Sequence, residues 1–240
     1  MIETILIMDR RIIKTADGSS TVAIQDMHVT YHSKHGAIQE SMHVFIEAGL
    51  HYAISKSLIR RPINILEIGF GTGLNAFLTS IEASNAKTKV YYLAIEQFPI
   101  TMEEVQSLNY TESLQHEELF IALHEGPWNK DVIINENFTL RKEKVDLLQF
   151  ATNQSFSLIY FDAFAPSAQP ELWTEEVFKK LYSMLLPKGI LVTYCSKSTV
   201  RRAMQAAGFE VEKIPGPPGK REMIRAAHLN PPGGRTSPRT

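Results

Sequence analysis

From residue 63 onward, apolar runs of strand length alternate with segments in which apolar residues recur at helical spacing. The strand-like runs lie at 63–68, 90–95, near 144–148, 157–161, 189–194, 209–214 and 222–227. The helical patterns lie between them, at 74–84, about 100–108, about 111–123, 174–186 and 197–207. This alternation predicts an α/β fold with a mainly parallel sheet that is covered by helices.

The two ends of the chain depart from this alternation. The last two strand-like runs are joined by Pro215–Gly219, which is too short for a helical crossover and predicts a terminal antiparallel strand. Short β-branched segments near 5–7, 11–14, 21–24 and 29–32 indicate hairpins, and apolar residues recur at helical spacing from Met42 to Leu58. We therefore expect a small β-hairpin and helix extension at 1–61, the main domain at 62–229 and a disordered tail at 230–240.

The segment Ile65–Asn75 leads from an apolar strand through three alternating glycines into a helical pattern. Glycine allows a sharp turn and a close approach of the backbone to a ligand, and the following helix offers free N–H groups. The glycines stand at Gly69, Gly71 and Gly73, whereas a dinucleotide fingerprint would have its third glycine at Leu74. The spacing therefore disfavours a pyrophosphate ligand and an NAD-dependent oxidoreductase.

Two carboxylates accompany this loop. Glu67 precedes the first glycine, and Glu96 ends the next apolar run, where an acid can accept hydrogen bonds from ribose hydroxyls. Acids beside the loop suit a cationic nucleoside such as S-adenosylmethionine. The pattern resembles the Rossmann-like class I S-adenosylmethionine-dependent methyltransferases, and the resemblance implies a cofactor site. We expect it to comprise Glu67, Gly69, Gly71, Gly73, Asn75 and Glu96.

Further acids follow two later strand-like runs. Asp146 could receive the adenine amine at the carboxyl end of the sheet, or it could cap a turn on the surface. Asp162 ends the run 158–161 and should face the cofactor methyl, where it could take a proton from an amine nucleophile. The alternative for Asp162 is a capping role. Phe164 and Trp173 could stack on a base, although packing is the commoner role of such aromatics.

Several motifs together resemble the methyltransferase domain of the bacterial MnmC family. They are Phe161–Pro166 with Pro170 and Trp173, the loop Glu67–Asn75, the segment Gly219–Met223, and upstream Tyr31–Ser33 and Gly36–Phe45. The resemblance spans roughly residues 20–228. It implies N-methylation of the 5-aminomethyl group on the wobble uridine of tRNA, giving 5-methylaminomethyl-2-thiouridine.

The resemblance also implies partners and residue roles. Two-domain relatives carry a flavin-dependent oxidoreductase for which this chain has no room, so it resembles the standalone form and would depend on separate enzymes for the aminomethyl precursor. Asp162 is our choice for the catalytic carboxylate. Glu40 and Tyr31 would line the substrate pocket, although Glu40 could instead be a helix-start acid. Lys220 and Arg221 would touch RNA phosphate, the alternative being exposed loop charges.

Composition narrows the picture further. The formal net charge is −1, but nine Lys or Arg and only three Glu lie from Lys197 onward, which could meet phosphates or form solvated faces. The single cysteine, Cys195, allows no intrachain disulfide, and no apolar run reaches membrane-spanning length, so we expect a cytoplasmic protein without a membrane or metal partner. Alternatives left open are methylation of a small amine or another RNA position, and a non-catalytic module that binds cofactor and RNA.

Overall fold

A small antiparallel sheet forms the N-terminal part of the computed structural model, which describes residues 9–56 and 62–228. Its strands are β1 (Arg10–Lys14), β2 (Ser20–Ile24) and β3 (Val29–Thr30), in the order β1-β2-β3. The hairpins expected from the β-branched segments are confirmed for these three strands. The strand expected near 5–7, the helix end near Leu58, the boundary at residue 61 and the tail at 230–240 lie outside the described residues.

The helical pattern that follows forms one continuous segment with a widened centre. It consists of α1 (Ala37–Ser41), the π-helical turn segment η1 (Met42–His51) and α2 (Tyr52–Ser55). Gly49 permits close packing on the sheet, because a Cβ there would lie 3.1 Å from Tyr160 Cε1 and 3.2 Å from Val192 Cγ2. The helix begins at Ala37 and Glu40 lies in its first turn, which agrees with the helix-start position expected for this acid.

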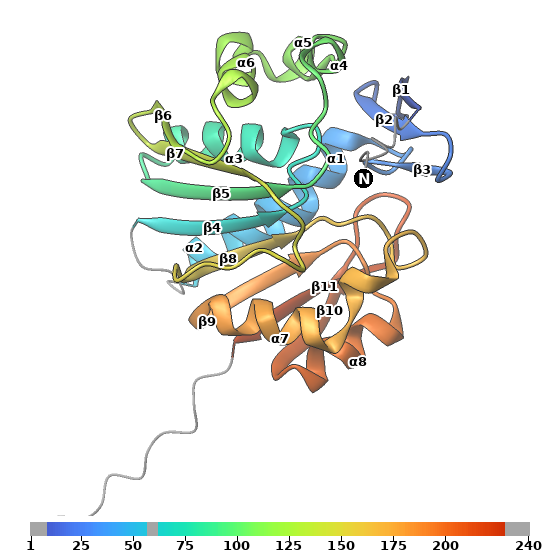
Figure 1. The fold of residues 1–240 in the computed structure, drawn as a ribbon, viewed down its shortest axis with the longest axis vertical. Coiled ribbons are helices and arrows are strands. Elements are labelled where there is room, and N and C mark those ends of the chain that lie inside the picture. The colour runs from blue at the N-terminus through green and yellow to red at the C-terminus, as the bar shows by residue number, and fades with distance from the viewer. Residues whose placement is uncertain (1–8, 57–61, 229–240) are drawn as a thin grey trace, which may run out of the picture.

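The main sheet has eight strands in the order β10-β11-β9-β8-β4-β5-β7-β6 (Figure 1). The strands β7, β5, β4, β8 and β9 are parallel, β11 runs antiparallel between β9 and β10, and β6 is an antiparallel edge. Their bounds are β4 (Ile63–Ile68), β5 (Val90–Glu96), β6 (Asp131–Asn135), β7 (Phe138–Lys144), β8 (Phe156–Phe161), β9 (Leu185–Thr193), β10 (Phe209–Pro215) and β11 (Glu222–His228). The predicted parallel sheet and terminal antiparallel strand are confirmed.

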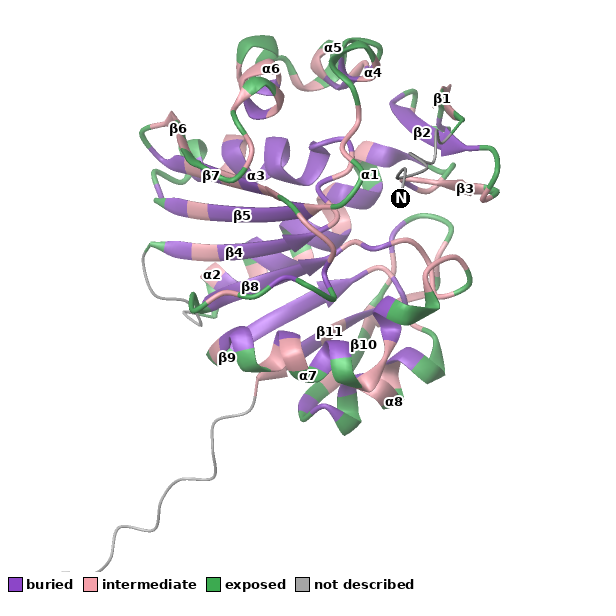
Figure 2. Cartoon of the chain, in the orientation of Figure 1, coloured by how far each residue is buried: buried purple, intermediate pink, exposed green. Residues whose placement is uncertain are grey.

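Helices cover both faces of this sheet and bury a core on each side (Figure 2). The helices of the main fold are α3 (Leu74–Asn85), α4 (Met102–Gln106), α5 (Tyr110–Leu114), α6 (Glu117–Glu125), the short η2 (Pro170–Trp173), α7 (Glu175–Met184) and α8 (Ser198–Ala206). On β4, Ile65 faces the core under η1, α3 and α6, whereas Leu66 and Ile68 face α7 and α8. The alternation of side chains along each strand produces these two cores.

One predicted strand is wrong. The run near 144–148 is a turn in which Leu148 is 49% exposed, and the strand beside β5 is β7, which ends at Lys144. The sequence pattern conceals β7 because Lys142 occupies an inward position after Phe138 and Leu140, and it is only 1% exposed. Its ammonium donates to His124 O at 2.6 Å, which allows a lysine where the period-2 pattern calls for an apolar residue.

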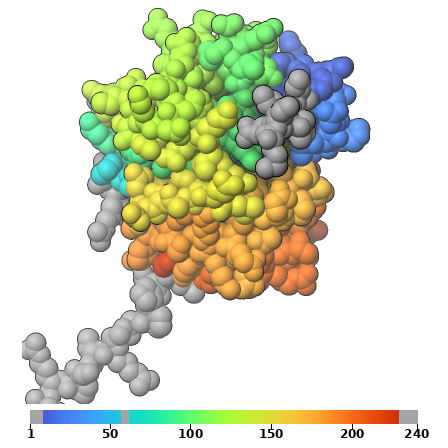
Figure 3. All heavy atoms as spheres, in the orientation of Figure 1, coloured from blue at the N-terminus to red at the C-terminus, as the bar shows by residue number. Residues whose placement is uncertain are grey.

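The N-terminal sheet is fastened to the segment that follows β5. Arg10 Nη2 donates to Phe98 O at 2.5 Å, and Ser20 N–H and Oγ donate to Asn109 Oδ1 at 2.6 and 2.7 Å. Figure 3 shows the blue N-terminal surface meeting the green surface of that segment. These bonds place the N-terminal residues beside the carboxyl ends of the parallel strands.

Candidate functional site

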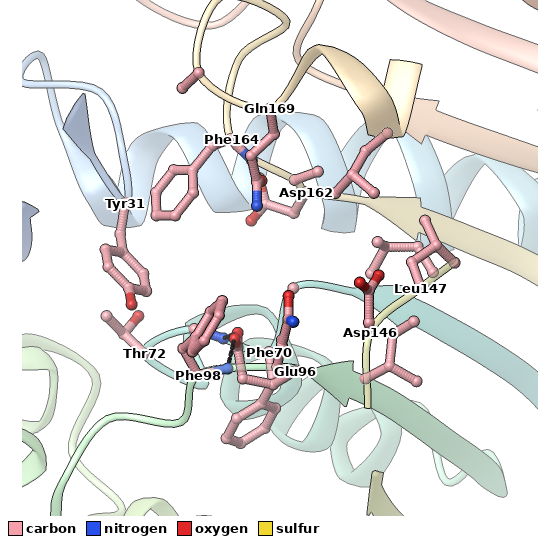
Figure 4. A pocket seen from close by; sticks show the side chains of 18 of the residues that line it. Tyr31, Phe70, Thr72, Glu96, Phe98, Asp146, Leu147, Asp162, Phe164 and Gln169 are labelled. Atoms are coloured by element: carbon pink, nitrogen blue, oxygen red, sulfur yellow. Dashed lines mark hydrogen bonds between the residues drawn. The ribbon is translucent and has the colours of Figure 1, made fainter. Parts of the chain in front are cut away.

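A cavity of about 260 Å³ opens at the carboxyl ends of β4, β5, β7 and β8 (Figure 4). Residues from each of these strand ends line it, joined by Tyr31 and His32 from the N-terminal part. In Figure 4, Asp162 and Phe164 lie on one wall, Glu96 and Phe98 lie on the opposite wall, and Asp146 stands at one end. The cavity therefore collects several of the predicted site residues at the place where parallel sheets bind ligands.

The glycine loop requires its glycines for conformation and for space. Gly69, Gly71 and Gly73 all adopt positive φ, at 89°, 51° and 73°. A Cβ at Gly69 would lie 2.9 Å from the backbone oxygen of Asp162, and one at Gly71 would lie 2.9 Å from the Tyr31 ring. Gly73 is the N-cap of α3. The loop thus turns from β4 into α3 by alternating left-handed residues that other side chains would strain.

Glu96, the last residue of β5, holds the loop in place. One carboxylate oxygen accepts the Gly71 N–H at 3.0 Å, and the other accepts the Phe98 N–H at 2.8 Å. A carboxylate oxygen can accept more than one hydrogen bond, so Glu96 keeps capacity for a ligand hydroxyl. Thr72 is held as well, since Tyr110 donates to its hydroxyl at 3.1 Å and His124 Nε2 donates to its carbonyl at 3.1 Å.

Asn75, in the first turn of α3, joins two carboxyl groups. Its amide Nδ2 donates to Glu67 Oε1 at 3.0 Å and to Asp162 Oδ2 at 2.9 Å. The amide oxygen of Asn75 and the second oxygen of Glu67 are buried without a hydrogen-bond partner among the described residues. Glu67 is fully buried and does not line the cavity. The sequence predicted that the Glu67 carboxylate would lie beside the ligand. In the structure, Asn75 lies between Glu67 and the cavity, so Glu67 could influence a cofactor only through Asn75.

Burial dominates the titration of both acids. It raises the pKa of Glu67 well above its usual range, and the Asn75 hydrogen bond only partly opposes this. Desolvation, with the negative charge of Glu40 second, likewise raises the pKa of Asp162 well above its usual range, while Asn75 and Lys220 lower it. A carboxylate with a raised pKa is a stronger proton acceptor. Asp162 therefore borders the cavity with a raised affinity for a proton.

Glu40 and Lys220, both expected to contact substrate, form an ion pair with each other. Lys220 Nζ lies 2.6 Å from Glu40 Oε1 and 4.0 Å from the centroid of the Tyr194 ring. The second oxygen of Glu40 accepts the Ser33 N–H at 2.6 Å. Glu40 is thus a buried, paired acid near Asp162. The ammonium of Lys220 is held by Glu40 in this structure.

The predicted aromatic residues divide into two groups. Tyr31 and Phe164 line the cavity and meet edge to face, with ring centroids 5.1 Å apart. Trp173 is only 6% exposed, packs edge to face on Phe161 at 4.8 Å and donates from Nε1 to Phe164 O at 2.8 Å. Of the two roles expected for Trp173, the structure agrees with packing and not with stacking on a base, because the side chain is buried in the core. It supports Phe164 instead.

The far end of the cavity is formed by Asp146 and by residues that the sequence did not single out. Asp146 lines the cavity and also caps its own turn, accepting the Leu148 N–H at 2.9 Å. Phe98 also lines the cavity and is 42% exposed, and Leu147 stands beside Asp146. In the sequence, an aromatic residue two positions after the strand-end acid Glu96 was the available signal for Phe98.

The remaining expectations concern the surface. Arg221 is exposed and lies outside the cavity, in a neighbouring groove. Within residues 9–56 and 62–228, no cluster of His, Cys, Asp and Glu could hold a metal ion. Over the same residues, no helix combines the length and apolar character needed to cross a bilayer.

Comparison with known proteins identifies the family. Residues 135–229 match the model of a family described as S-adenosyl-L-methionine-dependent methyltransferase. The chain is 32% identical over 217 residues to the tRNA 5-methylaminomethyl-2-thiouridine biosynthesis bifunctional protein MnmC of Leptospira borgpetersenii serovar Hardjo-bovis (strain JB197), covering 84% of this chain and 32% of the relative. The chain belongs to the MnmC methyltransferase-domain family.

Further members show the same partial overlap. The MnmC of Pseudomonas syringae pv. tomato is 28% identical over 226 residues, covering 88% of this chain and 34% of that protein. The chain thus spans about a third of the length of these curated relatives. The crystal structure of MNMC2 from Aquifex aeolicus superimposes with a TM-score of 0.75 at 27% identity, covering 92% of this chain and 71% of that one. The class I methyltransferase fold expected from the sequence is confirmed.

The cavity fits the cofactor of the MnmC family. S-adenosylmethionine carries an adenosine and a cationic amino-acid end, and the cavity has an acid at each of two strand ends, Glu96 and Asp146, with apolar walls from Phe98 and Leu147. Asn75 also lines the cavity, and its buried oxygen, without a partner among the described residues, offers an acceptor for an N–H donor. Glu96 would hold ribose hydroxyls, Asp146 the adenine amine and Asn75 the ammonium.

Proposed function

We propose that this protein methylates the 5-aminomethyl group of the wobble uridine in tRNA, giving 5-methylaminomethyl-2-thiouridine. The single observation that carries the proposal is the Asp162 carboxyl, which borders the cofactor cavity with a raised pKa between Asn75 and the Glu40 charge. Such a group suits a substrate that arrives as a cation and must lose a proton. The names of the MnmC relatives support tRNA as the substrate.

The protein would act by positioning and by proton transfer. When bound, S-adenosylmethionine supplies an electrophilic sulfonium methyl group. Asp162 would accept a proton from the substrate ammonium, because only the neutral amine has the lone pair needed for attack. Asn75 would keep the Asp162 carboxyl oriented through its 2.9 Å hydrogen bond. Burial around the pair would exclude water and strengthen these interactions.

Tyr31 and Phe164, beside Asp162, would receive the nucleobase (Figure 4). Tyr31 and Phe164 form a perpendicular aromatic pair at the cavity, and a uracil ring could stack on either face that remains accessible. Glu40 would attract the positively charged side arm from behind Asp162. Trp173 would contribute by fixing the backbone of Phe164.

The cellular setting is part of the proposal. A tRNA substrate implies a cytoplasmic location, with which the free Cys195 agrees. Separate enzymes would supply the aminomethyl precursor. We also propose that residues 1–61 act as an extension that completes the substrate side of a catalytic domain at 62–229.

The test is incubation with methyl-labelled S-adenosylmethionine and matched tRNA preparations that carry or lack the aminomethyl group, followed by nucleoside analysis. We expect label in 5-methylaminomethyl nucleosides only from the aminomethyl tRNA. Label in a small amine, or at another RNA position, would replace the proposal with methylation of that substrate. Measurable RNA and cofactor binding without any turnover would favour a non-catalytic module.

The residue assignment is tested by Asp162→Asn, which preserves shape and an acceptor for Asn75. We expect methyl transfer to fall by about 10²-fold or more, as for loss of a general base, with cofactor affinity retained. Asp26→Asn is the matched control, because Asp26 is an exposed aspartate outside the cavity. Full activity of Asp162→Asn would remove Asp162 from the mechanism.

A further inference from the structure

A second hollow lies beside the cofactor cavity. It is an open groove of about 310 Å³ that is lined by Ala165, Pro166, Tyr194, Cys195, Ser196, Lys197, Lys220, Arg221 and Glu222. The two hollows share one stretch of chain, because Ala163 and Phe164 line the cavity and the next two residues line the groove. Tyr194 also connects them, donating from its hydroxyl to Ala163 O at 2.8 Å. The groove therefore adjoins the cavity along residues 163–166.

Of the four charged side chains that line the groove, two form ion pairs among the described residues and two do not. Lys220 is paired with Glu40, and Glu222 is paired with Lys213 at 2.6 Å. Lys197 and Arg221 are exposed, and neither forms an ion pair within the described part of the chain. The free charge of the groove is therefore positive and is concentrated on these two side chains.

We propose that this groove is a phosphodiester subsite in which Lys197 and Arg221 bind a backbone phosphate next to the nucleotide whose base enters the cavity. The inference rests on the proposed function. It keeps Arg221 from the expectation that Lys220 and Arg221 contact RNA phosphate, and it replaces Lys220 by Lys197. Lys220 instead fixes Glu40 and stays on the protein.

The chemistry of the two side chains favours a polyanionic chain over a single small anion. Arginine presents a planar fork that matches phosphate oxygens, and lysine acts as a mobile point charge. The groove is open to solvent and adjoins the cavity along residues 163–166, where the strand next to a bound base would have to pass. Glu222, the one acid in the lining, is paired with Lys213 and also lies in the field of Arg221, so cations offset its charge.

The experiment measures binding of an anticodon stem–loop RNA by fluorescence anisotropy over a series of salt concentrations. The double variant Lys197→Ala/Arg221→Ala is compared with wild type and with Lys89→Ala/Lys179→Ala. The control removes the same charge from exposed lysines that line neither hollow. A plot of log affinity against log salt concentration has a negative slope, and we expect its magnitude in the groove variant to be smaller by about 1 for each phosphate no longer neutralised. The control variant should have the slope of wild type. The affinity for S-adenosylmethionine should not change in either variant.

The outcomes separate this inference from the proposed function. An unchanged salt slope in the groove variant, with wild type active on tRNA, would overturn the subsite alone. A reduced slope in a protein that transfers no methyl group to tRNA would support the subsite and overturn the proposed function. Displacement of the RNA by inorganic phosphate far better than by chloride at equal ionic strength would indicate a site for free phosphate and overturn the subsite.

Discussion

Lys220 Nζ lies 2.6 Å from Glu40 Oε1, although the two residues are 180 positions apart in the chain. The bond joins the tip of the β10–β11 hairpin to the N-terminal helix beside the cofactor cavity. Both charges act on Asp162, with Glu40 raising its pKa and Lys220 lowering it. The pair therefore adjusts the basicity of the proposed catalytic carboxylate.

Replacing Glu40 by Gln should lower the pKa of Asp162. The variant removes the negative charge that raises this pKa and leaves the opposing Lys220 charge without its partner. Because a general base must be deprotonated, the acid limb of the kcat/KM profile should move to lower pH. The substrate amine titrates identically with both proteins, so the difference belongs to the enzyme. Glu47→Gln on the same helical segment is the control, and a limb that stays in place would contradict the assignment.

Replacing Asn75 by Ala should have the opposite effect on the same limb. The variant removes a hydrogen bond that lowers the pKa of Asp162, so the acid limb should move to higher pH. It also leaves the buried Glu67 without its donor, which should reduce the free energy of unfolding by about 1–3 kcal/mol. Urea denaturation measures this loss. A shift to lower pH would show that Asn75 does not stabilise the charged form of Asp162.

Replacing Phe98 by Ala should weaken cofactor binding with little effect on folding. Phe98 lines the cavity and is 42% exposed, so it contributes little to the core. Loss of an aromatic surface under a base costs about 1–3 kcal/mol, which corresponds to roughly 5- to 150-fold in Kd. Isothermal titration with S-adenosylhomocysteine measures the change. Ile133→Ala, at a side chain 80% exposed on β6, is the control, and equal affinities for the two variants would exclude Phe98 from the site.

Replacing His124 by Gln should flatten the acid dependence of stability. Burial, followed by the Lys142 charge, lowers the pKa of His124 to about 3. The folded state therefore keeps this histidine neutral while the unfolded chain takes up a proton below about pH 6.5. Its contribution to stability is present above that pH and is lost as the pH falls toward 3. Between pH 6 and 4, the free energy of unfolding of the variant should change less steeply with pH than that of wild type, by up to about 1.4 kcal/mol per pH unit.

The comparison with wild type isolates this histidine. Glu67 and Asp162 act in the opposite direction, because their pKa values are raised in the folded protein. The stability that such acids contribute to the protein is lost as the pH rises through their folded pKa. Both acids remain in the variant, so they cancel in the difference. Identical slopes from urea denaturation would show that His124 titrates normally in the folded protein.

The sequence predicted those strands whose burial is visible as a continuous run of apolar residues. The apolar run of β4 followed by glycines, and the run of β8 followed by Asp162, could be recognised because burial on both faces requires continuous apolar strands. The strand β7 was missed for a physical reason. Its third inward position is Lys142, and the carbonyl that accepts its proton belongs to His124, which no local pattern connects to it.

Contacts at long range account for the site residues that changed role. Nothing near Lys220 in the sequence indicates that it pairs with Glu40. Likewise, nothing near Trp173 indicates that its ring packs on Phe161 and that its Nε1 donates to Phe164 O. Glu67 was predicted from its place beside the glycines. Its depth behind Asn75 depends on how α3 packs on β4. Residue type and motif thus indicated most residues that line the cavity, and tertiary packing determines the contacts among them.

The position of β11 has a consequence for synthesis of the chain. It is inserted between β9 and β10, so β10 has no strand partner in the sheet until β11 arrives. The hairpin tip that carries Lys220 reaches Glu40 only in that arrangement. During synthesis, the edge of β9 would therefore stay unpaired, and Glu40 would lack its Lys220 partner, until β11 has emerged from the ribosome.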